Sequence, residues 1–269
     1  MNLKQAIPLT SIHNARELGG YRTADGKTVK SGLLLRTGNL NGISAEDRRT
    51  LTERYRLQDL VDFRMAMEMQ GADEPIIDGA AYHHLNVIDP AAFGGEDMAA
   101  VDLNKLDLIQ LTQFTVESGM LGEGMYIGFL AGEPGKKAYA EFFRILLAAE
   151  PDRAVLWHCT SGKDRTGLAA MLLLSALGVE EERIIEDYLL TNVFNARRIA
   201  ATRQYLEAQG CGEDFIRQAV LVFDAVDESF MRKAIGFLKQ EYGSVPGYIR
   251  DGLGISQTEI DALRAKYLV

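Results

Sequence analysis

The chain has 269 residues, of which 47% are hydrophobic and 25% charged, and its 29 Lys and Arg against 38 Asp and Glu give a net charge of −9. This is the composition of a globular protein. The acidic balance disfavours proteins that coat nucleic acid or bind anionic membranes, because both need an excess of Lys and Arg. Only Cys159 and Cys211 are present, which excludes a disulfide framework and favours a reducing compartment.

The ends and apolar tracts of the sequence carry no signal for secretion or a membrane span. The N-terminus lacks an apolar stretch of about seven residues, and the longest apolar tract, 168–179, is shorter than the roughly 18 to 20 residues of a span. We therefore expect no stable membrane insertion and a cytoplasmic location, with secretion left open if a leader was removed. No repeat or linker interrupts the chain, so we expect a single domain over 1–269.

The first third of the sequence predicts short strands and one helix. Residues 17–36 mix turn residues with β-prone pieces and predict small strands or a hairpin. Ser44-x-x-Asp47 resembles a capping box that opens a helix to about residue 55. Residues 57–63 read as a buried strand with Asp62 and Arg64 at its carboxyl end. Ligands bind at this edge of open α/β sheets, so both are candidate substrate-binding residues.

The rest of the chain alternates strand and helix signals. Residues 82–135 look irregular, and 88–130 is interpreted as a surface loop or a segment covering the substrate. Helical spacing predicts a helix over 136–149, a buried strand follows at 154–158, and an apolar helix runs to residue 177. Helical patterns cover about 180–207, 212–225 and 227–242, and Ser256-x-x-Glu259 is a second capping box. The alternation predicts an α/β fold with a parallel sheet packed on both faces.

One stretch carries recognisable chemistry, and it reads His158-Cys159-Thr160-Ser161-Gly162-Lys163-Asp164-Arg165-Thr166-Gly167. A Cys and an Arg six positions apart are a weak signal alone. Here a buried strand leads into the Cys, a small polar loop follows, and a helix begins at the Arg. Successive backbone N–H groups at a helix N-terminus can surround an anion. The stretch therefore predicts a loop that holds phosphate or another oxyanion.

Each residue type in the loop has a chemical reason to be there. Cys159 as a thiolate is the candidate nucleophile, and the donors that bind phosphate also favour its ionised form. Arg165 offers a planar fork of N–H donors that can grip two phosphoryl oxygens. Gly162 has no Cβ where the backbone nears the ligand. Thr166 can donate its hydroxyl to the sulfur when the sulfur is the leaving group.

A general acid must protonate the departing oxygen, and Asp164 is the nearest candidate. Asp62 and Asp89, in the Ile-Asp-Pro turn at 88–90, are its rivals, and Asp164 could instead brace the loop through backbone N–H groups. His158 is expected either to orient the loop by hydrogen bonding or to be a buried, satisfied histidine.

Three other readings of these residues are less favoured. Lys163 after Gly162 suggests a nucleotide-binding P-loop, but that motif needs Gly at Trp157 and Ser or Thr at Asp164. The neighbouring residues His83 and His84 lack further spaced ligands, so we expect no metal and no cofactor. Cys211 is expected to be a small apolar residue.

At these residues the sequence resembles the Cys-x5-Arg protein phosphatase superfamily. The Gly-Lys-Asp-Arg-Thr-Gly run is similar to bacterial tyrosine and phosphoinositide phosphatases, and three further stretches agree: 14–21 with an Asn-Phe-Arg-Asp-Leu-Gly-Gly opening, 61–64 with an Asp-Leu-Arg strand end, and 187–192 with the helix after the loop. The resemblance spans nearly the whole chain. Ala15, Glu17 and Phe63 depart from the pattern outside the loop, which bears on packing and substrate choice more than on chemistry.

The resemblance implies a phosphatase-like α/β fold with a short, mostly parallel sheet and a helical lid over about 191–226. It implies Cys159 as nucleophile, Arg165 as phosphate clamp, Asp164 as acid and Lys163 as a contact to substrate phosphates. The phosphate-binding set is then Thr160, Ser161, Gly162, Lys163, Thr166 and Gly167, with His158 beside it. Substrates would be phosphotyrosine proteins or phosphoinositides. The alternatives are a catalytically weak phospho-ligand-binding module, or an arsenate reductase with Cys211 as resolving thiol.

Overall fold

The computed structural model describes residues 4–69, 75–88, 106–119 and 121–269. In this part of the chain the centre is a five-stranded sheet in the order β1-β2-β5-β3-β4. Its strands are β1 (Arg16–Glu17), β2 (Leu34–Thr37), β3 (Asp59–Asp62), β4 (Ala81–His84) and β5 (Val155–His158). Strand β1 is antiparallel to β2, and the other neighbours pair in parallel. The predicted α/β class with a short, mostly parallel sheet is therefore confirmed.

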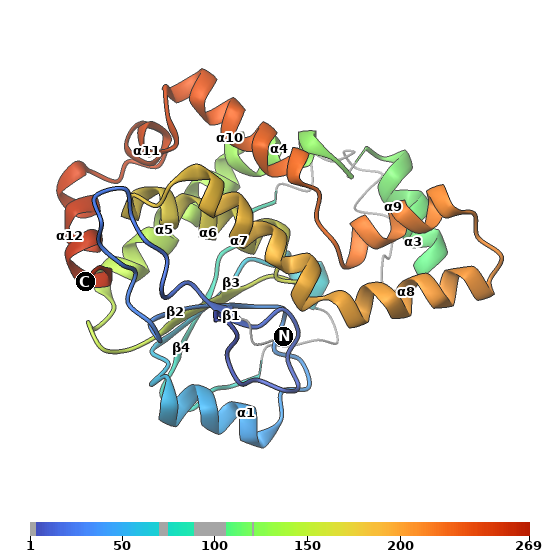
Figure 1. The fold of residues 1–269 in the computed structure, drawn as a ribbon, viewed down its shortest axis with the longest axis horizontal. Helices are drawn as coiled ribbons and strands as arrows, with labels where there is room; N and C mark the ends of the chain where they lie inside the picture. The colour runs from blue at the N-terminus through green and yellow to red at the C-terminus, as the bar shows by residue number, and fades with distance from the viewer. Residues whose placement is uncertain (1–3, 70–74, 89–105, 120) are drawn as a thin grey trace.

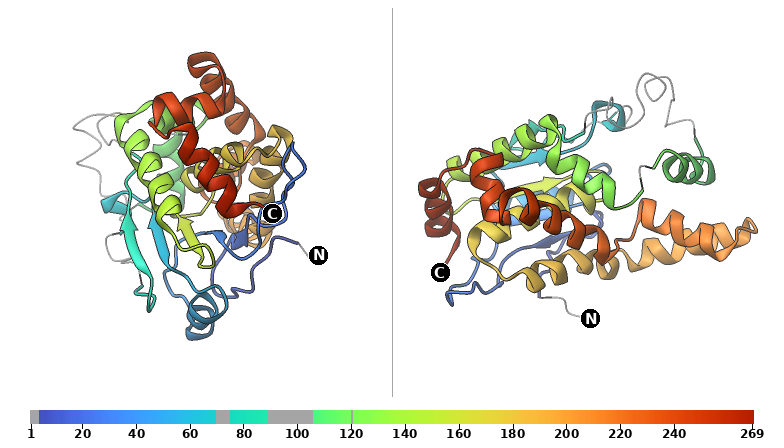
Figure 2. Two further views of the ribbon diagram at one scale, coloured as in Figure 1. Left: turned by 90° about the vertical axis from the view of Figure 1, so that its left-hand side faces the viewer. Right: turned by 90° about the horizontal axis from the view of Figure 1, so that it is seen from above.

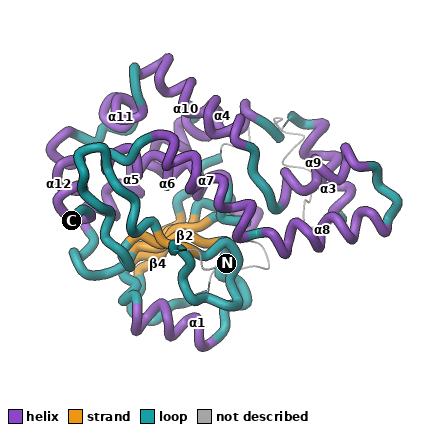
Figure 3. The backbone as a smooth tube through the Cα atoms, viewed as in Figure 1, coloured by secondary structure: helices purple, strands orange, loops and turns teal. Residues whose placement is uncertain are grey.

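Helices surround this sheet (Figure 3). They are α1 (Ala45–Arg49), α3 (Leu108–Glu117), α4 (Glu123–Ala131), α5 (Glu133–Ala148), α6 (Asp164–Leu177), α7 (Glu181–Phe194), α8 (Ala196–Ala208), α9 (Glu213–Phe223), α10 (Glu228–Tyr242), α11 (Val245–Gly247) and α12 (Gln257–Tyr267). A π-helical turn, η1 (Thr50–Arg54), continues α1, a 3₁₀ turn, η2 (Ala66–Met69), follows β3, and a second π-helical turn, η5 (Tyr248–Gly252), follows α11.

The three central strands β2, β3 and β5 are buried on both faces, whereas the edge strand β4 is largely exposed. Successive residues of a strand point to opposite sides of the sheet. One face packs under α5 and α6 in the larger core and carries Leu34, Val61, Val155 and Trp157. The other face packs with Leu51 and Tyr55 near α1 and carries Leu35, Leu60 and Leu156. Figure 1 shows α1 on one side of the sheet and α5, α6 and α7 on the other. This two-sided burial explains why apolar residues follow one another directly in β2, β3 and β5.

The parallel strands bring their carboxyl ends to one edge. Thr37 and Asp62 both align with His158, and Asp62 also aligns with His84. The loop that follows His158 therefore begins between the ends of β2 and β3. This confirms the predicted position of Asp62 at the carboxyl end of its strand.

Both predicted capping boxes mark real helix starts. The Ser44 hydroxyl accepts from the Asp47 amide at the start of α1, and the Ser256 hydroxyl accepts from the Glu259 amide, whose carboxylate returns to the Ser256 N–H. The apolar helix predicted to end at residue 177 is α6. It ends at Gly178 in the left-handed conformation (φ 87°), which glycine adopts without strain.

The prediction that 82–135 is irregular is wrong in its described part, where α3 and α4 are helical. A role of 88–130 in covering the substrate stays a prediction. Helix α3 starts with a capping box of Asp107 and Gln110, a signal that the glycine-rich surroundings obscured. Helix α4 contains Gly124 and Gly128, yet it packs between α5 and α10, and tertiary packing overrides the low helix propensity of glycine. Residues 89–105 lie outside the described residues.

The helix predicted over 180–207 is two helices, because the chain turns at Asn195. This residue is fully buried and its side-chain amide donates to the Asp224 carbonyl at 2.8 Å. Beyond the turn, α8 and α9 form a hairpin that extends away from the sheet (Figure 2). Together with α3 they enclose a small apolar cluster of their own, separate from the two cores on the sheet.

Among the described residues, no helix combines the length and the apolar character needed to cross a membrane.

The capping box of α12 gives a first prediction. Ser256→Ala removes the side-chain acceptor for the Glu259 amide and is expected to lower the free energy of unfolding by about 1 kcal/mol, because one helix-end N–H loses its partner. Urea denaturation measures this change. Thr258→Ala is the matched control, since Thr258 is exposed in the same turn. Equal unfolding midpoints for Ser256→Ala and the unmodified chain would contradict the assigned cap.

Candidate active site

The loop that carries the sequence motif joins β5 to α6, as predicted. Strand β5 ends at His158 and α6 begins at Asp164, one residue before the predicted start. Side chains from outside the loop hold its carbonyls: Asn39 donates to Thr160 (3.0 Å), Asn14 to Ser161 (3.2 Å) and Gly162 (2.9 Å), and Arg36 to Gly162 (3.1 Å).

The loop amides are left available to a ligand. Within the described part of the chain, the N–H groups of residues 160–165 donate to no other protein group. The carbonyls are drawn toward Asn14, Arg36 and Asn39, and the amides next to a helix N-terminus bind anions. This arrangement of the backbone is the one that the predicted oxyanion site requires.

Gly162 is required by the backbone for a different reason from the predicted one. Its φ is +66°, and a Cβ there would lie 2.1 Å from the Thr37 carbonyl oxygen at the end of β2. A side chain would thus collide with the sheet, whereas the sequence had suggested a close approach to the ligand. The loop backbone at Gly162 therefore packs directly against the end of β2.

Cys159 lies at the start of this loop beside two guanidinium groups. Both Arg36 and Arg165 interact electrostatically with it. The residue is only 1% exposed. The sulfur, which would have to contact a phosphoester to react with it, is therefore covered in this conformation.

Arg165 is held by a carboxylate that the sequence analysis did not identify. Its two terminal nitrogens donate to Glu68 at 2.6 and 2.7 Å, and Nη1 also donates to the Phe63 carbonyl at 3.2 Å. Burial alone would lower the pKa of Arg165, but Glu68 more than offsets this and holds it above its usual value. Within the described residues, Nε and one Nη2 hydrogen remain for two phosphoryl oxygens.

A buried ionic cluster lies behind the loop. Asp187 on α7 contacts Arg16 at 3.3 Å and Arg36 at 2.6 Å, and the Tyr21 hydroxyl donates to it at 3.2 Å. Burial alone would raise the pKa of Asp187, but the two guanidinium groups hold it below its usual value. Burial and Arg16 lower the pKa of Arg36 to about 10, so it stays charged at neutral pH. Arg36 thereby links Asp187 to the Gly162 carbonyl.

Asp164 contacts a buried tyrosine and no backbone amide. The Tyr126 hydroxyl donates to its Oδ1 at 2.5 Å, and its Oδ2 lies 3.5 Å from the Lys163 ammonium nitrogen. Within the described residues no backbone N–H donates to this carboxylate, so the alternative of a loop brace lacks the contacts it requires. Its side chain keeps 19% exposure, so it is not fully enclosed.

Asp62 and Arg64 are buried and pair with each other. Arg64 donates to both Asp62 oxygens at 2.6 to 3.0 Å, and Tyr82 donates to Asp62 at 2.9 Å. Burial alone would raise the pKa of Asp62, but His158 and Arg64 hold it low. This arrangement does not support the predicted substrate contacts of either residue or Asp62 as the acid. Asp89 lies outside the described residues.

Lys163 is turned toward the carboxyl end of α9 and the residues that follow it. Its ammonium donates to the carbonyls of Leu221 at 2.5 Å and Ala225 at 3.2 Å, and the residue is 4% exposed. The predicted contact with substrate phosphates is therefore not open in this conformation. The same lysine connects the loop to the helical hairpin.

The remaining motif residues differ in the contacts they make. Nδ1 of His158 donates to the Cys159 carbonyl at 3.0 Å, in line with the expected orienting role. Thr166 Oγ1 is buried without a hydrogen-bond partner among the described groups, so its predicted bond to the sulfur is not formed here. Gly167 lets α6 approach α7, since a Cβ there would lie 3.2 Å from the Tyr188 ring.

The candidates for a metal site have other partners. His83 bonds to Asp59 and His84 to the Arg64 carbonyl, both at 2.8 Å. In the described ranges, no group of three or more His, Cys, Asp or Glu side chains is placed to hold a metal ion.

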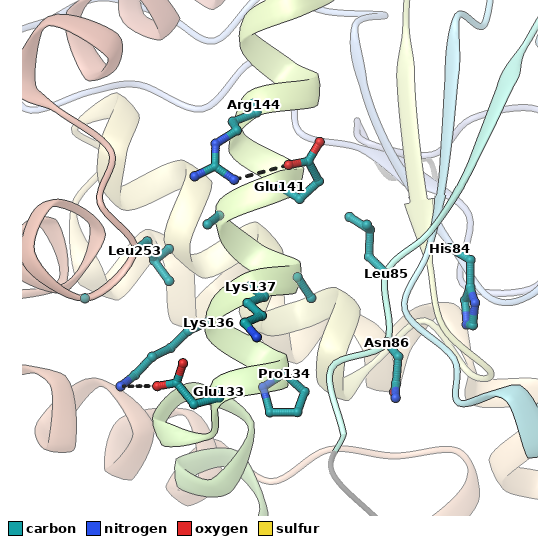
Figure 4. A pocket seen from close by; sticks show the side chains of 13 residues that line it. His84, Leu85, Asn86, Glu133, Pro134, Lys136, Lys137, Glu141, Arg144 and Leu253 are labelled. Atoms are coloured by element: carbon teal, nitrogen blue, oxygen red, sulfur yellow. Dashed lines mark hydrogen bonds and ion pairs between the residues drawn. The ribbon is translucent and has the colours of Figure 1, made fainter.

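A groove of about 630 Å³ lies between α5 and the residues after β4 (Figure 4). It contains no residue of the 158–167 motif. Two of its cations are already paired, Lys136 with Glu133 at 3.5 Å and Arg144 with Glu141 at 3.2 Å. The loop therefore remains the better candidate for an anion site.

Several contributors to the site were missed in the sequence, namely Asn39, Arg36, Glu68 and Tyr126. Arg36 carried a usable signal, since a charge that ends the apolar run at 33–35 is rarely buried without a partner. Glu68, Asn39 and Tyr126 carried none, because ordinary polar and aromatic residues in turns and helices have no distinctive pattern.

Comparison with known proteins agrees with this geometry. The model of the tyrosine phosphatase family matches residues 7–269. The chain is 33% identical to a protein of Cupriavidus necator provisionally named a tyrosine-protein phosphatase, over 97% of this chain and 88% of that one. It is 27% identical to the triple specificity protein phosphatase PtpB of Mycobacterium tuberculosis, over 97% and 98%. A tyrosine-protein phosphatase of Nostoc commune is 31% identical over 65% of this chain and 57% of its own.

The chain belongs to the tyrosine phosphatase family. The resemblance stated from the loop motif is thus confirmed, together with a phosphatase-like fold and an enzyme of the phosphatase class. The two alternatives, a binding module and an arsenate reductase, are not favoured. Cys211, the thiol that a reductase would use, packs in the apolar cluster of α3, α8 and α9.

The ionic cluster gives a second prediction. Asp187→Asn leaves two buried guanidinium groups without their counter-charge, so the free energy of unfolding at neutral pH is expected to fall by about 3–5 kcal/mol. The folded pKa of Asp187 is depressed, so its contribution is present above the unfolded pKa of about 3.9 and is lost as pH falls further.

Urea denaturation of both proteins between neutral pH and about pH 3 measures this. The difference between them should shrink below about pH 4. Asp152→Asn is the control, because Asp152 forms an exposed ion pair with Arg56. A difference that is constant across the range would show that Asp187 is not the group that titrates.

Proposed function

We propose that this phosphatase hydrolyses phosphate monoesters, phosphotyrosine among them, through a phospho-cysteine intermediate on Cys159. The observation that carries the proposal is the loop of free amides at the start of α6, with Cys159 and the Arg165 fork beside it. Such a loop neutralises an oxyanion and keeps doing so as charge shifts to its equatorial oxygens.

In the first displacement the Cys159 thiolate attacks phosphorus. A sulfur–phosphorus bond forms and the bond to the leaving oxygen breaks, while Asp164 transfers its proton to that oxygen. Arg165 binds two phosphoryl oxygens through Nε and Nη2, oriented by Glu68.

In the second displacement water attacks the phospho-cysteine. Asp164, now a carboxylate, takes the proton of the water, the sulfur–phosphorus bond breaks and inorganic phosphate leaves. Thr166 is the group next to the loop that can donate to the departing sulfur, because its hydroxyl is buried without another partner among the described groups. We therefore propose that the Thr166 hydroxyl turns to the sulfur during this second displacement.

We infer phosphotyrosine proteins as the main substrates and phosphoinositides as additional ones. The similarity to a phosphatase named for triple specificity supports a broad range. Lys163, once released from its contacts, offers a cation next to the loop for a second phosphate. We also propose one catalytic domain and a cytoplasmic location, supported by two free thiols that oxidation would inactivate or crosslink.

The catalytic assignment gives a third prediction. Cys159→Ser is expected to lower kcat for para-nitrophenyl phosphate by about a thousand-fold or more, since an alcohol does not replace the thiolate, and chelators should not affect the unmodified enzyme. Steady-state rates with phosphotyrosine peptides, phosphoserine peptides and phosphoinositides then rank the substrates by kcat/KM. Cys211→Ser is the matched control and should retain full activity. Turnover that survives in Cys159→Ser would overturn the mechanism.

We further propose that residues 191–226 act as a lid over the loop. Support comes from the buried Cys159 and from Lys163, which bonds to the end of α9. Asn192 adds two hydrogen bonds to Val226, at 2.8 and 3.0 Å. In this proposal, substrate reaches Cys159 when these contacts break.

The lid gives a fourth prediction, made in a Cys211→Ser background so that Cys159 is the single thiol. Asn192→Ala removes both hydrogen bonds to Val226 and should speed alkylation of Cys159 by iodoacetamide about ten-fold, equivalent to about 1.4 kcal/mol. Gln204→Ala, exposed on α8, is the control and should alkylate at the unmodified rate. Identical alkylation rates for both variants would argue against a lid whose opening breaks the contacts between Asn192 and Val226.

A further inference from the structure

We propose that Tyr126 and Tyr188 are positioning residues that fix the Asp164 carboxyl for proton transfer at the phosphate loop. This deepens the proposed function and rests on Asp164 as its general acid. The three side chains come from α4, α7 and α6, which lie on the same side of the sheet (Figure 1).

The hydroxyls form a chain with one direction. The Tyr126 hydroxyl is 2.5 Å from Asp164 Oδ1 and 2.6 Å from the Tyr188 hydroxyl. An ionised carboxylate can only accept, so Tyr126 donates to Asp164, and its oxygen must then accept from Tyr188. Burial, and next the charge of Asp164, raise the pKa of both hydroxyls well above the usual value. Both tyrosines therefore remain protonated donors throughout the reaction.

The hydrogen bonds from Tyr188 to Tyr126 to Asp164 make the two Asp164 oxygens different. Oδ1 is occupied by the Tyr126 donor, so the proton that the acid transfers is carried on Oδ2. Oδ2 lies on the side of Lys163, 3.5 Å from its nitrogen, next to the loop. Only one of the two oxygens is thus left to meet a leaving group or water.

The tyrosine rings cannot easily move. Tyr126 is fully buried and Tyr188 is 1% exposed. Their rings meet edge to face at 6.2 Å, and the Phe230 ring lies 5.7 Å from Tyr126 on another side. Asp164 itself is the first residue of α6, where a free carboxylate would turn to its own helix amides. The rigid Tyr126 hydroxyl opposes that rotation.

The test is a comparison of leaving groups. Phenyl phosphate has a basic leaving group that needs the acid, whereas para-nitrophenyl phosphate needs it far less. Tyr126→Phe should lower kcat for phenyl phosphate about ten-fold with KM unchanged, and kcat for para-nitrophenyl phosphate less than about two-fold, because misplacement removes part of the acid's contribution. Tyr188→Phe should show the same selectivity at about three-fold and serves if Tyr126→Phe does not fold.

Tyr248→Phe is the matched control. It deletes a fully buried hydroxyl that donates to the Leu130 carbonyl of α4, the helix that carries Tyr126, at 2.7 Å. It should change both substrates equally. In an Asp164→Asn background, Tyr126→Phe should have no further selective effect.

The outcomes separate two failures. If Asp164→Asn slows phenyl phosphate selectively but Tyr126→Phe slows both substrates equally, the positioning role is wrong and the acid assignment stands. The positioning role is also wrong if the selective loss caused by Tyr126→Phe persists in the Asp164→Asn background. If Asp164→Asn itself shows no selectivity, Asp164 is not the acid and the proposed mechanism fails at that step.

Discussion

The site depends on the buried interaction of Asp187 with Arg16 and Arg36. A lone guanidinium would be costly to bury, and the shared carboxylate makes two of them tolerable behind the loop. Arg36 also donates to the Gly162 carbonyl, which fixes the direction of the loop peptides. Asn14 completes the arrangement, because its side-chain amide donates to the same carbonyl while its own oxygens accept from Arg16.

This cluster explains why particular residues far from the loop in sequence occur together with the loop motif. Asn14 and Arg16 belong to the opening stretch, and Asp187 to the helix after the loop, yet all three meet behind Gly162. The sequence could predict the loop, the strand before it and the helix after it, because these are contiguous and their apolar pattern is simple. Their association with the other stretches entered through the family resemblance, and the ionic contacts give it a physical cause.

Other parts were beyond the reach of sequence patterns for identifiable reasons. Glu68 orients Arg165 across 97 residues, and Tyr126 reaches Asp164 across 38, so no local spacing links them. Asp62 and Arg64 pair because their side chains fold toward each other at a strand end, whereas the apolar pattern indicated only their position along the strand. Helix α4 forms despite its glycines because α5 and α10 enclose it, a tertiary effect.

Lys163 has one ammonium and two uses for it. While Lys163 donates to the carbonyls of Leu221 and Ala225, its ammonium is not available to a second phosphate of the substrate. In the proposed mechanism the end of α9 therefore competes with the substrate for Lys163. Because it belongs to the same chain, it is present at a high effective concentration. The apparent affinity for a substrate would then depend on how much more strongly Lys163 binds its second phosphate than the two carbonyls. Ligands with a single charge would displace the carbonyls least well.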